Sequence, residues 1–128
     1  MFNQEETIEM RLKAVPILRV MDVPTTKEFY GDFLGCQVDW EHYYEEGAPV
    51  YMQMSRNEFV VQLSENNRYR EGSIIFVGVE GIEELHGELS QKHNLRQPPT
   101  ISLTPWNTKQ MEIFDPFGNL LRFNESVS

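Results

Sequence analysis

The order of the predicted strands and helices constrains the fold of this chain more than any other feature. A buried strand, an amphipathic helix and three more strands are predicted in residues 14–63, and the same β-α-β-β-β order recurs in residues 73–123. The halves share almost no identities, so the repeat is one of pattern. Two such units can pair their sheets around a ligand-sized cleft. We therefore predict an α+β fold in which two βαβββ modules (13–65 and 72–125) form curled mixed sheets around a cleft, within a single domain, 1–128.

The first predicted helix, residues 25–34, has signals at both ends. Thr25 and Glu28 fit a capping box, in which each side chain bonds the other residue's amide. Gly35 supplies the left-handed residue that often ends a helix. The strand predicted next, residues 36–42, alternates so that Val38 and Trp40 share one face.

Charge and cysteine content limit the functional classes. The formal net charge is -9, which disfavours nucleic acid as a partner. Cys36 is the one cysteine, so no internal disulfide can form, and we expect it to be buried rather than reactive. The first ten residues are acidic, unlike a signal peptide, and no run is long enough to cross a membrane. We expect a cytoplasmic protein with no membrane partner.

Two blocks of residues carry a family likeness. The opening block comprises residues 14–20, 22–23, 29–30 and 33–35, and the closing block comprises residues 105–106, 115–119 and 122–123. Together they resemble the glyoxalase/bleomycin-resistance/dioxygenase (vicinal oxygen chelate) superfamily. The closest likeness is to bleomycin-resistance proteins, because Trp106 follows Pro105 and the chain is acidic. Asn107 departs from the Gly that this family usually places after the Trp.

The resemblance implies a homodimer with clefts near its interface. It also places the family's four metal-ligand positions at Val15, Gln62, Ser73 and Arg122. Val15 has no ligand atom, Arg122 is a permanent cation, and Gln62 and Ser73 are weak neutral ligands. We therefore expect no metal, no cofactor and no catalytic residue.

Aromatic and polar residues at the expected cleft are candidates for binding a small molecule. The predicted ligand-binding residues are Trp106, Trp40, Tyr43, Gln62, Ser73 and Arg122. The aromatic residues could instead be ordinary core residues. Arg122 could bind a ligand carboxylate or phosphate, or be neutralised internally by a carboxylate such as Glu112. Both alternatives remain open at this point.

Three functions fit this pattern. The first is a non-catalytic protein that sequesters a small molecule in an aromatic-lined cleft, as bleomycin-resistance proteins do, which would confer antibiotic resistance. The second is a metal-dependent glyoxalase-like lyase or isomerase, or a ring-cleaving dioxygenase, which requires ligands displaced by a strand slip. The third is a partner-binding or regulatory domain that kept the fold and lost the ligand.

Overall fold

The computed structural model describes residues 9–92 and 99–127. It contains two successive βαβββ units, which confirms the predicted order. The elements of the first are β1 (Ile17–Arg19), α1 (Val23–Thr26), η2 (Lys27–Phe33), β2 (Gln37–Tyr43), β3 (Val50–Arg56) and β4 (Phe59–Ser64). Those of the second are β5 (Ile74–Gly78), α2 (Ile82–Ser90), β6 (Ser102–Leu103), β7 (Thr108–Phe114) and β8 (Leu120–Ser126).

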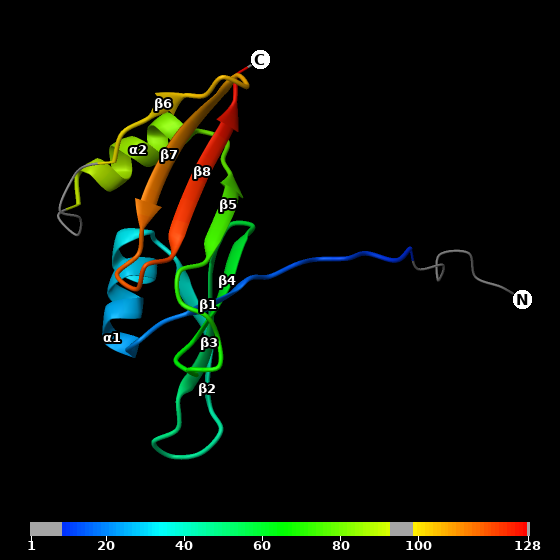
Figure 1. Cartoon of the computed structure of the whole chain (residues 1–128), viewed down its shortest axis with the longest axis vertical. Coiled ribbons are helices and arrows are strands. Elements are labelled where there is room, and N and C mark those ends of the chain that lie inside the picture. The colour runs from blue at the N-terminus through cyan, green and yellow to red at the C-terminus, as the bar shows by residue number, and fades with distance from the viewer. Residues whose placement is uncertain (1–8, 93–98, 128) are drawn as a thin grey trace, which may run out of the picture.

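Each unit forms one four-stranded mixed sheet. The strand orders are β1-β4-β3-β2 in sheet 1 and β5-β8-β7-β6 in sheet 2. The first strand of each unit pairs with the last in parallel, and the other pairs are antiparallel. Both helical segments lie on the side of the sheets opposite to the projecting N-terminal arm (Figure 1). The predicted α+β class with curled mixed sheets is confirmed.

The first helix begins and continues differently from the prediction. Its N-cap is Asp22, whose carboxylate accepts the amide of Thr25 at 2.7 Å, so the predicted capping box is wrong. The helix widens into the π-helix η2, where the amide of Leu34 donates to the carbonyl of Phe29, five residues back. Gly35 follows with φ of +79°, the left-handed conformation that its lack of a Cβ permits, as predicted.

A β-bulge in β2 changes which residues share a face. Val38 pairs with Met54, but the register shifts, and Trp40 pairs with Gln53. Residues opposite each other in a ladder lie on the same face of a sheet. Val38 therefore lies on the face of the buried Met54, and Trp40 lies on the opposite face, with Gln53. The predicted common face for Val38 and Trp40 is therefore wrong, because the bulge inserts one residue between them.

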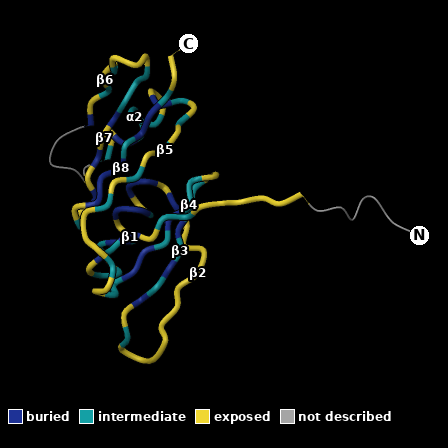
Figure 2. The backbone as a smooth tube through the Cα atoms, turned by 45° about the vertical axis from the view of Figure 1, so that its right-hand side comes forward, coloured by how far each residue is buried: buried dark blue, intermediate teal, exposed yellow. Residues whose placement is uncertain are grey.

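The buried residues form one core that draws on both sheets and all the helical segments (Figure 2). At its centre the Tyr30 hydroxyl donates to the carboxylate of Asp115 at 2.6 Å, and the Asn119 amide donates to the Arg19 carbonyl at 3.0 Å. These bonds join the first unit to the β7–β8 turn. Cys36 is buried as expected, and burial raises the pKa of its thiol to about 11. Among the described residues, no helix has the length and apolar character needed to cross a membrane.

Candidate functional site

The face of sheet 1 that points away from the helices carries a line of polar side chains. On β3, Met52 and Met54 are buried, whereas Tyr51, Gln53 and Ser55 alternate with them and lie on the opposite face. Gln53 is paired with Gln62 of β4 on one side and Trp40 of β2 on the other. The strand register therefore places Trp40, Gln53 and Gln62, from three strands, side by side.

These side chains are joined by hydrogen bonds. The Tyr51 hydroxyl donates to Oε1 of Gln62, Nε2 of Gln62 donates to Oε1 of Gln53 at 3.1 Å, and Nε2 of Gln53 donates to Oδ2 of Asp39 at 3.1 Å. Ser55 also donates to Asp39, at 2.9 Å. We call Asp39, Gln53, Gln62 and Tyr51 the polar row.

The polar row combines a fixed carboxylate with an aromatic surface. Hydrogen bonds from Gln53 and Ser55 lower the pKa of Asp39, so its carboxylate is charged at neutral pH. Trp40 is exposed beside the row, and its ring meets that of Tyr51 edge to face, with centroids 5.2 Å apart. This arrangement offers hydrogen-bond donors and acceptors next to a stacking surface.

The corresponding face of sheet 2 carries an apolar side chain next to an ion pair. Arg122 lies between Phe76 of β5 and Glu112 of β7 in one cross-strand row. Its Nε donates to Oε2 of Glu112 at 2.8 Å. Of the two alternatives for Arg122, the structure therefore shows the internal ion pair. Phe76 is 68% exposed on the free side of the sheet.

The structure brings only some of the predicted ligand-binding residues together. Trp40 and Gln62 share a cross-strand row with Gln53, but Arg122 lies on the other sheet. Tyr43 is opposite Val50, on the other face of sheet 1 from Trp40. Trp106 lies in the β6–β7 turn and is 66% exposed. Ser73 precedes β5, where its amide donates to the side chain of Asn119 at 3.0 Å.

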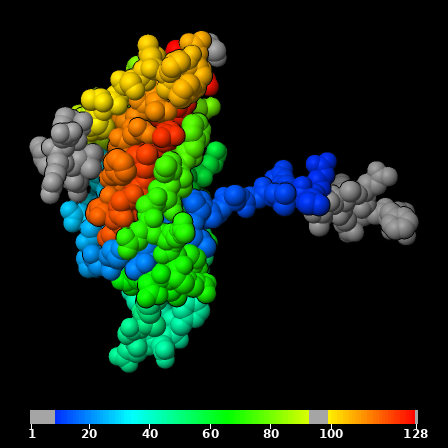
Figure 3. Space-filling model, viewed as in Figure 1, coloured from blue at the N-terminus to red at the C-terminus, as the bar shows by residue number. Residues whose placement is uncertain are grey.

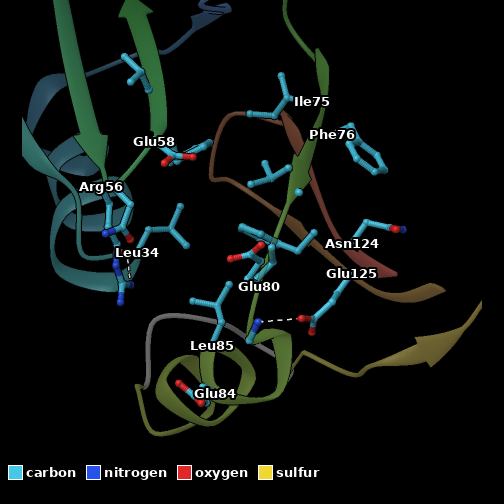
Figure 4. A pocket seen from close by; sticks show the side chains of 18 of the residues that line it. Leu34, Arg56, Glu58, Ile75, Phe76, Glu80, Glu84, Leu85, Asn124 and Glu125 are labelled. Atoms are coloured by element: carbon cyan, nitrogen blue, oxygen red, sulfur yellow. Dashed lines mark hydrogen bonds between the residues drawn. The ribbon is translucent and has the colours of Figure 1, made fainter. Parts of the chain in front are cut away.

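A cleft of about 1240 Å³ separates the β3–β4 end of sheet 1 from β5, α2 and the end of β8 (Figure 4). None of the six predicted ligand-binding residues lines it. Its apolar walls include Phe59, Ile75 and Leu85. At one side Arg56 forms a two-pronged ion pair with Glu88 of α2, at 2.7 and 2.9 Å.

The donor set does not fit the divalent metal of the superfamily's enzymes. At the four positions carried over, valine and an ion-paired arginine supply no ligand atom, leaving one amide and one hydroxyl. Within residues 9–92 and 99–127, no three side chains of His, Cys, Asp or Glu gather in a group that could hold a metal ion. We therefore assign no metal-dependent step to these residues.

Sequence reasoning missed Asp39, Gln53 and Tyr51. The alternation of Tyr51, Gln53 and Ser55 with apolar residues was a usable signal, because it marks a polar face on β3. Nothing comparable marked Asp39, because the bulge that places its carboxylate on the face of the row arises from pairing between strands.

Several bacterial proteins of known structure have the same fold as this chain. A glyoxalase family protein from Enterococcus faecalis matches with a TM-score of 0.70 and 20% identity, over 90% of this chain and 97% of that one. A superfamily member from Sphaerobacter thermophilus matches with a TM-score of 0.69 and 19% identity, over 92% and 100%. The bleomycin-binding protein of Streptomyces verticillus, complexed with copper(II)-bleomycin, matches with a TM-score of 0.67 and 21% identity, over 94% and 100%.

Sequence comparisons give the family. No curated protein matches the chain. The model of a glyoxalase superfamily protein family matches residues 4–128. With nearly the whole chain covered by that match, this protein belongs to the glyoxalase superfamily.

Proposed function

We propose that this chain binds a small molecule without chemically changing it, and that the ligand lies on the outer face of sheet 1. The observation that carries the proposal is the polar row beside the exposed Trp40 ring. A planar ligand group would stack on Trp40, and its polar groups would exchange hydrogen bonds with Gln53 and Gln62.

Charge narrows the class of ligand. The chain has a net charge of -9, and Asp39 adds a fixed carboxylate to the row. A planar ligand that carries a positive charge gains from both, through long-range attraction and then a charge-assisted hydrogen bond. If such a ligand were a toxic drug, sequestration would lower its free concentration and confer resistance. Bleomycin is a suitable first probe, because a bleomycin-binding protein shares this fold.

The two tryptophans allow a matched test. In Trp106→Phe the sole tryptophan is Trp40, and in Trp40→Phe it is Trp106. We expect titration with bleomycin, metal-free or copper-loaded, to quench the tryptophan fluorescence of Trp106→Phe. The fluorescence of Trp40→Phe should stay nearly unchanged. Gln62→Ala should weaken binding about tenfold, the effect of one or two lost hydrogen bonds. Gln110→Ala, on the equivalent face of sheet 2, is the control and should bind normally.

Fluorescence quenching seen only in Trp40→Phe, the variant that retains Trp106, would contradict the proposed location of the site on sheet 1. If millimolar bleomycin produced neither heat in a calorimetric titration nor quenching of tryptophan fluorescence, bleomycin would be excluded as the ligand. Elemental analysis of protein purified without chelator tests the enzyme alternative. Stoichiometric Ni, Zn, Fe or Mn would contradict non-catalytic binding and favour a metal-dependent lyase, isomerase or dioxygenase.

A further inference from the structure

The cross-strand row through Tyr51 ends at an arginine on the outer face of sheet 1. Tyr51 of β3 is opposite Ser64 of β4, and Ser64 is in turn opposite Arg19 of β1. Leu18, the neighbour of Arg19, is buried in the core, so Arg19 points to the outer face. This row lies two residues along β4 from Gln62, or roughly 7 Å. Arg19 is therefore on the face where we place the ligand.

The guanidinium of Arg19 has a buried N–H group without an acceptor. Its Nη1 donates to the carbonyl of Tyr69 at 3.4 Å, which is long for a hydrogen bond. Its Nε is buried and has no hydrogen-bond partner among the described residues. Arg19 also forms no ion pair with any residue that the structure describes. A guanidinium left in this state is costly, so an acceptor brought by a ligand would stabilise it.

The segment that follows β4, residues 65–72, adds a second cation at this end of the sheet. It passes in front of β1 and β3 in Figure 1, and in Figure 3 its green atoms lie against the blue atoms that lead into β1. Nη2 of Arg68 donates to the Tyr69 hydroxyl at 3.0 Å, and its guanidinium lies 5.0 Å from the centre of that ring. Arg68 is exposed and, within residues 9–92 and 99–127, forms no ion pair. Burial and neighbouring tyrosines raise the pKa of Tyr51 and the charge of Arg68 opposes them, so Arg68 is close to the row.

We propose that Arg19 and Arg68 form a subsite for an oxyanion, either a carboxylate or a phosphate, at this end of the outer face of sheet 1. Arg19 supplies the N–H group that lacks an acceptor, and Arg68 supplies a second positive charge. The subsite stands by itself, but its link to the polar row rests on the proposed function. A ligand that fills both places carries a planar cation near Asp39 and Trp40 and an acid near Arg19, so it is a zwitterion.

Charge makes a zwitterion a better fit than a simple anion. The net charge of -9 repels a free anion at long range. The two arginines act over short distances, because salt screens exposed charges beyond about 10 Å at 0.1 M. A ligand with one charge of each sign has no net charge, so the long-range repulsion does not oppose its approach. Once bound, its acid meets Arg19 and its cation meets Asp39, which fixes its orientation along the face.

The first test observes the Arg19 side chain by ¹H–¹⁵N NMR, in which its Nε–H resonance is the one missing from Arg19→Lys. Titration with inorganic phosphate or with acetate, at constant ionic strength, should shift this resonance saturably at millimolar concentration, and the tighter of the two identifies the preferred oxyanion. Arg68→Gln, an exposed change, should weaken the response roughly threefold. Lys109→Gln removes the same charge from sheet 2 and should leave the response unchanged. No shift with either anion would overturn the subsite.

A matched pair of ligands tests the link to the polar row. Nicotinamide riboside carries a planar cation, and nicotinamide mononucleotide carries the same cation with a phosphate. In calorimetric titrations, the mononucleotide should bind the wild type at least about tenfold more tightly, and Arg19→Gln should bind both equally. Equal affinity of the wild type for both would overturn the subsite. A phosphate response at Arg19 without quenching of Trp40 fluorescence by either ligand would support the subsite and contradict the ligand position given by the proposed function.

Discussion

Replacing Tyr30 with phenylalanine removes one oxygen atom from the centre of the core. Tyr30 is fully buried, and its hydroxyl donates to Oδ2 of Asp115 at 2.6 Å. Burial, followed by the nearby Asp115 carboxylate, raises the pKa of Tyr30, so the hydroxyl keeps its proton at neutral pH. The carboxylate also accepts from the amide of Phe117 and from the backbone and side chain of Asn119, at 2.8 to 2.9 Å.

The size of the effect follows from these contacts. A hydrogen bond to a charged group contributes about 1.5–3 kcal/mol. Three donors to Asp115 remain in Tyr30→Phe, and the space left is one atom, so we expect about 2 kcal/mol. That is a large fraction of a typical domain stability of about 5–15 kcal/mol.

Urea denaturation followed by circular dichroism measures this loss. The transition midpoint of Tyr30→Phe should fall by roughly 1 M, with an unchanged slope. Tyr44→Phe is the matched control, because Tyr44 is 74% exposed, and its unfolding free energy should stay within about 0.5 kcal/mol of wild type. A Tyr30→Phe midpoint equal to that of the control would refute the view that this hydroxyl stabilises Asp115.

Two further predictions concern backbone and helix ends. Gly35→Ala should lower the unfolding free energy by more than about 1 kcal/mol, because alanine is strained at a φ of +79° and its Cβ would lie 3.0 Å from the Arg56 guanidinium; an unchanged urea midpoint would contradict this. The Glu125 carboxylate accepts the amides of Gly81, the N-cap residue of α2, and of Ile82, the first residue of α2, and these hydrogen bonds lower its pKa. Its stabilising effect, present above the unfolded-state pKa of about 4.3, is lost as the pH falls through the folded value. Glu125→Gln should therefore be less stable at pH 7 and less sensitive to acid, as thermal unfolding between pH 7 and pH 3 would measure.

Local patterns determine most of the fold, and pairing between strands determines most of the site. The element order and the helix end at Gly35 follow from periodicity and from the residue type at the helix end, and the structure confirms them. The bulge that separates Val38 from Trp40 depends on the partner strand, so alternation within β2 could not reveal it.

The same distinction applies to the candidate site. Gln62 and Trp40 were identified and lie in one row, but Gln53, the residue that connects them, lies on a strand whose register with its neighbours is set by long-range pairing. The binding roles of Tyr43, Trp106, Ser73 and Arg122 remain predictions. Asp115 entered the sequence analysis only as part of the closing family block, because its contact with Tyr30 joins positions 85 residues apart.

The π-helix η2 has a consequence for alignment with relatives. A π-turn spans one more residue than an α-turn, so a relative with a regular α-helix here needs a one-residue gap within this helix. An alignment without that gap would displace every following position by one, until a later gap restored it. In a strand, such a displacement exchanges the two faces, so a buried methionine of β3 would be matched to a residue of the polar row. Functional positions should be transferred onto this chain by superposition of β3 and β4 rather than by counting from the first helix.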